Sequence, residues 1–129
     1  MDQFDDDLRK ANEFYTVALL CFEQGYHNSC ANRAYYAMFR AAFAALKKFV
    51  SPTILPEPPD HKRLIGKFTN ELINRRKVFP SNFGNYLHEN LKYRIIGDYK
   101  LDDVSKRNAR RCLNYAQEFL TKVEEVVTQ

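Results

Sequence analysis

The stretch that decides the fold runs from Arg33 to Phe43 and reads RAYYAMFRAAF. At helical spacing its apolar side chains cover almost the whole circumference, whereas a helix at a protein surface keeps a polar face. Between Cys30 and Phe49 the charged and amide side chains are only Asn32, Arg33, Arg40, Lys47 and Lys48. Such a helix needs cover on more than one side. It is therefore either the central element of a bundle or part of an interface between subunits.

Helical spacing continues on both sides of this stretch, and no segment alternates like a half-buried strand. We therefore predict an all-α protein, an antiparallel bundle of four to five helices. Gly25 is expected to end the first helix, and Asp60 to cap the third after a proline-rich loop, residues 51–60. The first two expected helices cover about residues 5–24 and about 28–50. The third begins at His61 and frays across residues 75–80, and the fourth runs from Ser81 or Asn82 to Gly97. The last expected helix is capped by Asp102 or Asp103.

Length and composition narrow the class of protein. The chain has 129 residues, 45% apolar and 28% charged, and we expect residues 1–129 to form one globular domain. No apolar run approaches the length that spans a membrane, and the acidic start, residues 2–7, lacks the positive charge that opens a signal peptide. The expected location is the cytoplasm. The net charge of +4 does not by itself indicate a nucleic-acid binder.

We expect no metal and no other cofactor. The cysteines, at positions 21, 30 and 112, lie among apolar residues without Cys-x-x-Cys spacing, which indicates buried reduced thiols. The histidines, at positions 27, 61 and 88, are scattered and lack the spacing of zinc ligands. The chain also has no glycine-rich phosphate loop and no nucleophile elbow.

Arg33 and the tyrosines beside it are the first candidates for a binding site. An arginine on an apolar helix costs free energy unless an anion pairs with it. Arg33 therefore forms a buried salt bridge, extends to solvent, or contacts a phosphate in a cleft. Tyr35 lies on the expected core stripe and should pack there, whereas Tyr36 is better placed to present its hydroxyl.

A second group of candidates comes from later in the chain. Arg94 and Asp98 stand four residues apart, so they either pair on one helix or act together, with Arg94 facing a ligand and Asp98 orienting it beside Tyr99. His61 begins a helix after the loop, where an anion is favoured and where a histidine can change its charge near neutral pH. A lone histidine is also a common surface or packing residue.

Basic side chains gather at residues 62–63, 75–77 and 106–111. Such runs are usually solvated faces, and the alternative is a surface that follows a phosphate backbone.

The candidate residues belong to a recognisable pattern. In order, the chain carries Gly25-Tyr26, the segment Arg33–Phe39, His61 at a helix start, RIIGDY from Arg94 to Tyr99, and AQEFL at residues 116–120. This order and spacing resemble the HEPN family (higher eukaryotes and prokaryotes nucleotide-binding domain) over nearly the whole chain, and most of all its small stand-alone prokaryotic members. The resemblance implies a helical bundle that commonly forms a homodimer. It also implies a role near nucleotides or RNA.

The resemblance further implies a choice between two kinds of activity. Many members pair with a small nucleotidyltransferase in toxin–antitoxin modules, and others are metal-independent ribonucleases that carry an arginine followed, after four to six residues, by a histidine. No histidine here has an arginine at that spacing, and Arg94 is followed by Asp98 instead. An aspartate does not supply the imidazole that acid–base cleavage near pH 7 needs.

We therefore expect a non-catalytic bundle that dimerises through one flank and binds a nucleotide, RNA or a nucleotidyltransferase partner. The first alternative is a ribonuclease toxin that uses His61 and Arg94. The second is a structural scaffold with no ligand, in which the polar residues only hold helices together. The expected binding cleft is lined by Arg33, Tyr36, His61, Arg94, Asp98 and Tyr99.

Overall fold

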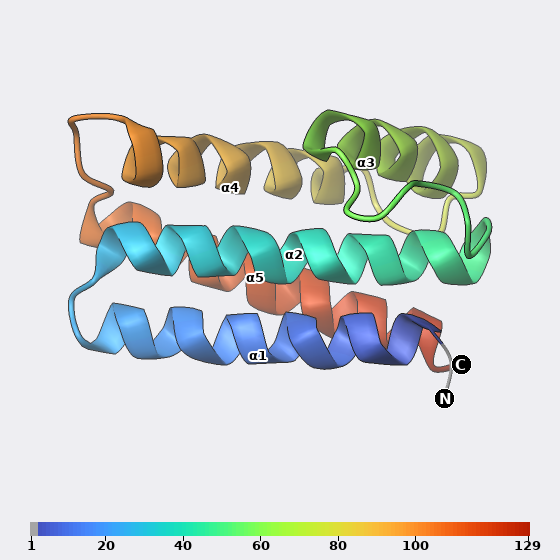
Figure 1. Ribbon diagram of the computed structural model, residues 1–129, viewed down its shortest axis with the longest axis horizontal. Helices are drawn as coiled ribbons and strands as arrows, with labels where there is room; N and C mark the ends of the chain where they lie inside the picture. Colours follow the sequence, from blue (N-terminus) through green and yellow to red (C-terminus); the bar gives the residue numbers. More distant parts are fainter. Residues whose placement is uncertain (1–2) are drawn as a thin grey trace.

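The computed structural model describes residues 3–129, with side chains from residue 5 onward, and over this range the protein is all-α (Figure 1). The predicted helical bundle is thus confirmed. Met1 and Asp2 of the acidic start lie outside the described residues. The elements are α1 (Gln3–Glu23), α2 (His27–Phe49), α3 (His61–Lys67), the π-helix η1 (Phe68–Arg75), α4 (Asn82–Tyr99) and α5 (Lys106–Val127).

Helix α2 is the central element of the bundle. It contacts every other helical element, and fourteen of its residues are buried. In Figure 1, α1 runs antiparallel beside α2, α4 and α3 lie along its other side, and α5 lies behind. Small side chains at Ala37, Ala41 and Ala44 are fully buried, which lets the neighbouring helices approach closely. The apolar circumference of the RAYYAMFRAAF stretch therefore reflects cover from several helices of the same chain.

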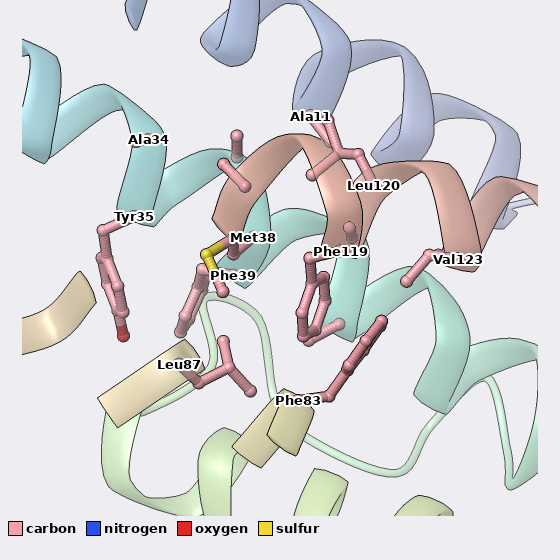
Figure 2. Close-up of a cluster of buried hydrophobic side chains, with 14 of the residues drawn as sticks. Ala11, Ala34, Tyr35, Met38, Phe39, Phe83, Leu87, Phe119, Leu120 and Val123 are labelled. Carbon is pink, nitrogen blue, oxygen red and sulfur yellow. The ribbon is translucent and has the colours of Figure 1, made fainter. Parts of the chain in front are cut away.

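Aromatic side chains fill the core where η1, α4 and α5 meet (Figure 2). The ring of Phe119 lies 5.0 Å from that of Phe83 and 5.3 Å from that of Phe68, and Phe79 stacks 5.1 Å from Phe68. Each is at most 3% exposed, and burying such a ring contributes about 1.5–3 kcal/mol. This packing holds the start of α4 against η1 and α5.

Two local signals in the sequence end and begin helices as predicted. Gly25 takes a φ of 82°, and the amides of Gly25 and Tyr26 donate to the carbonyls of Phe22 and Cys21, which closes α1 in a Schellman motif. Asp60 caps α3, and its carboxylate accepts from the amide of Arg63 at 3.0 Å. The helix that begins there ends with η1 at Arg75, the first residue of the segment predicted to fray, and its π-helical second half is not foreseen by the sequence pattern.

The predicted role of Gly97 is wrong. Helix α4 does not end at Gly97 but continues to Tyr99. A Cβ atom at Gly97 would lie 3.1 Å from the Cα of Asn28, so this glycine allows the start of α2 to pack against α4. A close approach between helices, and not a chain reversal, is therefore the reason for a glycine here.

The predicted caps of the last helix are also wrong. Ser105, and not Asp102 or Asp103, caps α5, and its hydroxyl accepts from the amide of Asn108 at 3.1 Å. Asp103 accepts instead from the side chain of Asn28 at 2.9 Å, and Asn28 accepts from the amide of Val104 at 2.8 Å. The loop before α5 is therefore held by α2, at the end of the bundle that carries Gly97.

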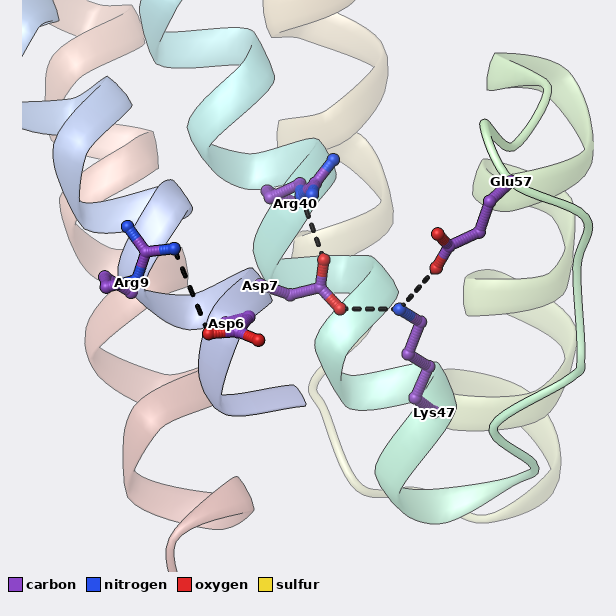
Figure 3. A network of polar contacts seen from close by, with 6 residues as sticks. All are labelled: Asp6, Asp7, Arg9, Arg40, Lys47 and Glu57. Carbon is purple, nitrogen blue, oxygen red and sulfur yellow. Dashed lines mark hydrogen bonds and ion pairs between the residues drawn. The ribbon is translucent and has the colours of Figure 1, made fainter. Parts of the chain in front are cut away.

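A polar network fixes the opposite end of α2 (Figure 3). Lys47 is only 6% exposed and donates to Asp7 of α1 at 2.8 Å and to Glu57 of the proline-rich loop at 2.7 Å. Arg40 faces the other oxygen of Asp7 at 2.9 Å, close enough for an ion pair but not aligned for a hydrogen bond. The network ties α1, α2 and the loop together, so it restrains the segment that leads to His61.

Candidate functional site

The six residues predicted to line a cleft come from three elements. Arg33 and Tyr36 lie on α2, His61 begins α3, and the residues from Arg94 to Tyr99 form the last part of α4. Contacts through the Tyr36 ring join the elements. Its centroid lies 5.5 Å from the guanidinium carbon of Arg33, 5.4 Å from that of Arg94 and 5.7 Å from the His61 ring. These six residues, which we call the arginine–tyrosine cluster, thus form one connected group.

A chain of hydrogen bonds links the two arginines. Nε of Arg33 donates to the side-chain oxygen of Asn32 at 2.7 Å, and the amide nitrogen of Asn32 donates to Asp98 at 2.8 Å. The same carboxylate oxygen of Asp98 accepts from Nε of Arg94 at 3.2 Å, which is the pair predicted from the spacing of four. Nη2 of Arg94 donates to the Tyr99 hydroxyl at 3.3 Å. Asp98 therefore pairs directly with Arg94 and is linked to Arg33 through Asn32.

Arg33 is held mainly by aromatic rings. Its guanidinium carbon lies 5.0 Å from the ring centroid of Phe14 on α1, in addition to its contact with Tyr36. Within the described part of the chain, Arg33 forms no ion pair, so the salt bridge considered from the sequence is not what holds it. Its terminal nitrogens have no acceptor there either, which leaves them available to an anion.

Sequence reasoning missed Asn32 and gave Tyr35 a packing role only. Tyr35 is fully buried, as predicted, but its hydroxyl also lies 2.8 Å from Nδ1 of His61. Burial lowers the pKa of His61, the positive charge of Arg94 lowers it further, and Asp60 opposes both. A signal for Asn32 existed in the sequence, because an amide beside an arginine on an apolar helix needs polar partners of its own.

A groove of about 740 Å³ lies between α3–η1 and α4. Its walls include the apolar side chains of Ile65, Leu91 and Ile95. Of the six cluster residues, His61 and Arg94 line this groove, and the other four do not. The structure therefore brings the predicted residues together without placing all of them in one cleft. Four of them form the surface next to the groove.

The remaining candidates do not join the cluster. The basic residues at 62–63, 75–77 and 106–111 are exposed except for Arg111, and the guanidinium carbon of Arg110 covers the ring of Phe22 at 4.5 Å. Cys30 and Cys112 are buried free thiols, and burial raises the pKa of each to about 12, whereas Cys21 is half-buried.

Two further properties concern the described residues as a whole. Residues 3–129 contain no group of three or more His, Cys, Asp or Glu side chains arranged to hold a metal ion. None of the described helices combines the length and the apolar character needed to cross a membrane.

Comparison with known proteins agrees with this fold. The family model described as HEPN domain matches residues 5–126, nearly the whole chain. A search of curated proteins found no match. The match spans all five α-helices, including the α2 segment that carries Arg33 and Tyr36 and the α4 segment that carries Arg94. The chain therefore belongs to the HEPN family.

Proposed function

We propose that this HEPN protein binds a phosphate group of a nucleotide or of RNA at Arg33 and Arg94, and that it does not cleave the bound molecule. The observation that carries the proposal is the charge of the arginine–tyrosine cluster. Two guanidinium carbons lie within 5.5 Å of the centroid of Tyr36, and Asp98 is the one carboxylate that joins them in the described chain. The excess positive charge favours an anion, and phosphate oxygens match the planar fork of arginine.

The exposed aromatic ring beside the arginines supports a nucleotide over inorganic phosphate. Tyr99 is 71% exposed, and the guanidinium carbon of Arg94 lies 5.4 Å from its ring centroid. A base stacked on an exposed aromatic ring gains about 1–3 kcal/mol. Tyr36 is less suited to this task, because both arginines and the ring of Phe39, 6.1 Å away, surround it.

The position of Asp98 argues for binding without cleavage. This carboxylate already accepts from Arg94 and Asn32, so it serves to orient the arginine. It does not provide an imidazole for acid–base catalysis near pH 7, and no histidine follows Arg94 at the spacing of the family's ribonucleases, where this chain has Tyr99, Lys100 and Leu101.

Titration calorimetry with AMP, ATP and a short RNA at low salt tests binding. Losing a charge-assisted hydrogen bond costs about 1.5–3 kcal/mol, so Arg33→Ala should weaken binding about 10-fold to 100-fold. Arg75→Ala is the matched control, because Arg75 is an exposed arginine whose one ion-pair partner among the described residues is Glu71 on η1. Its affinity should equal that of the wild type. No heat of binding at millimolar ligand, or equal losses in both variants, would contradict the proposal.

A second candidate function is metal-independent cleavage of RNA by His61 and Arg94. It is favoured by one observation, that both side chains line the same groove. Purified protein incubated with RNA and a chelator distinguishes the candidates. Cleavage that disappears in His61→Ala would support the ribonuclease, and intact RNA at protein excess would exclude it. Growth of cells after induction of the wild type and of His61→Ala gives an independent readout.

The proposal also includes a homodimer and a small nucleotidyltransferase as partner, in a module of the toxin–antitoxin type. It is supported by membership of the HEPN family and by apolar side chains at the surface of α1, where Leu20 is 54% exposed. Light scattering should give twice the 15.2 kDa mass of one chain. A monomer at all concentrations up to about 100 μM would argue against the dimer, since weaker association falls outside the range of stable complexes.

A further inference from the structure

We infer that Tyr35 is a positioning residue, which fixes the imidazole of His61 in the tautomer with its proton on Nε2 and turns that N–H toward the groove. The Tyr35 hydroxyl lies 2.8 Å from Nδ1 of His61, and the two ring centroids are 5.5 Å apart. The inference that the Nε2–H group contacts a ligand rests on the proposed function. The inference about the tautomer is independent of that function.

The direction of this hydrogen bond follows from burial. Tyr35 is 0% exposed, and within the described residues its hydroxyl has one hydrogen-bond partner, Nδ1 of His61. A buried hydroxyl proton without an acceptor costs free energy, so the phenol donates and Nδ1 accepts. Burial also raises the pKa of Tyr35 well above its ordinary range, so the phenol keeps its proton. A neutral imidazole that accepts at Nδ1 must carry its own proton at Nε2.

Packing then sets where the Nε2–H group points. The His61 ring lies against Phe39, with centroids 4.7 Å apart, and Nδ1 points toward the buried hydroxyl on α2. Nε2 is on the other side of the ring, and His61 lines the groove with Arg94. This wall of the groove therefore offers an uncharged donor next to a cationic one. Such a pair suits a phosphate ester, whose oxygens accept from both.

The same hydrogen bond disfavours a charged His61. A protonated imidazole would donate from Nδ1 to the Tyr35 oxygen, and the phenol proton would then lose its buried acceptor. The other groups around His61 act partly in the same direction, because Arg94 lowers the pKa of His61 and Asp60 raises it. The titratable and charged groups that face it are Tyr35 and Tyr36 from α2, Asp60 and Lys62 from its own segment, and His88 and Arg94 from α4.

Nitrogen-15 NMR of the imidazole rings at pH 7.5 tests the tautomer without any ligand. The wild type should show one His61 tautomer, with Nδ1 unprotonated and Nε2 protonated. Tyr35→Phe should shift both nitrogens toward an average of the two tautomers. Tyr93→Phe is the matched control, because Tyr93 is another buried tyrosine but, within the described residues, has no hydrogen bond or ring contact with His61. It should leave the His61 signals unchanged.

Calorimetric titration with AMP tests the positioning role. Tyr35→Phe should weaken AMP binding about 2-fold to 10-fold, the range expected for one misaligned hydrogen bond. His61→Gln retains an N–H donor near the position of Nε2 but has no acceptor at Nδ1. It should therefore lose the alignment that Tyr35 provides and bind AMP about 2-fold to 10-fold more weakly than the wild type, as Tyr35→Phe does. In that background Tyr35→Phe should have no further effect.

The outcomes separate the two proposals. Averaged tautomers in the wild type, or an equal loss of affinity from Tyr35→Phe with and without His61→Gln, would overturn the positioning role. A fixed Nε2–H tautomer in a protein that binds no AMP would support the positioning role and contradict the proposed function. The wild-type spectrum alone decides the tautomer even if Tyr35→Phe does not fold.

Discussion

Asp7→Ala is the substitution whose effect on stability follows most directly from the structure. Asp7 is 4% exposed and pairs with Lys47, itself 6% exposed, and with Arg40. Removing one partner of a buried ion pair costs about 3–5 kcal/mol, because the remaining charge stays desolvated. Lys47 keeps its bond to Glu57, which is 67% exposed, so we expect the lower end, about 3 kcal/mol. For 129 residues this corresponds to a fall in Tm of about 11 °C.

Differential scanning calorimetry at pH 7 measures this loss. Asp6→Ala is the matched control, because Asp6 is the preceding residue on α1, is 61% exposed and lies 3.9 Å from Arg9. It should cost less than about 1 kcal/mol, as exposed pairs do. The double variant Asp7→Ala with Lys47→Met should recover most of the stability, because it removes both buried charges. Equal Tm values for the two single variants would refute the reasoning.

The pH dependence of the network follows from the pKa shifts. Burial lowers the pKa of Lys47, but the hydrogen bonds to Asp7 and Glu57 together raise it above its ordinary value of 10.5. The contribution of Lys47 to the free energy of unfolding is therefore complete below pH 10.5, and it is lost as the pH rises through the raised pKa that Lys47 has in the folded protein. The hydrogen bond from Lys47 lowers the pKa of Glu57 below its ordinary value of 4.5. The contribution of Glu57 to the free energy of unfolding is therefore complete above pH 4.5 and is lost as the pH falls through the lowered pKa. The deficit of Asp7→Ala should thus be constant between about pH 6 and 9.

Two further predictions concern packing and thiol chemistry. Gly97→Ala should destabilise the protein by about 1–3 kcal/mol in denaturant titration, because the new Cβ would lie 3.1 Å from the Cα of Asn28. Gly66→Ala is the control, because a Cβ at Gly66 would have no neighbour within 4 Å, and it should be neutral or stabilising. A stable Gly97→Ala variant would contradict the close approach of α2 and α4. Cys112 should react with a thiol reagent at pH 8 only as fast as the protein unfolds, because burial raises its pKa to about 12, and Cys21 should react first. Mass spectrometry of partly labelled protein identifies the modified site, and early labelling of Cys112 would contradict its burial.

Features that depend on nearby residues could be predicted well. The αL turn at Gly25, the Asp60 cap and the pair of Arg94 with Asp98 all join residues within five positions of one another. Local geometry decides such contacts, so spacing and residue type are sufficient.

Features that depend on distant residues could not be predicted. Asn28 holds Asp103 and Val104 across more than 70 positions, which is why the caps of α5 and the role of Gly97 were predicted wrongly. The Asp7–Lys47 pair likewise joins residues 40 positions apart. Asp103 looks like a helix cap locally, but its partner is Asn28, on a distant helix of the fold.

For this protein, the sequence by itself determined the all-α fold, the need to cover α2 on more than one side and the types of side chain that could bind a phosphate, because the periodicity of apolar residues dictates which faces must be buried. Only the tertiary structure decided that Arg33 and Arg94 meet at the ring of Tyr36, that two of the six cluster residues, His61 and Arg94, line the groove, and that Tyr35 bonds to His61. These contacts depend on how α2, α3 and α4 pack. Helix packing is set by many side chains at once, and no short motif records it.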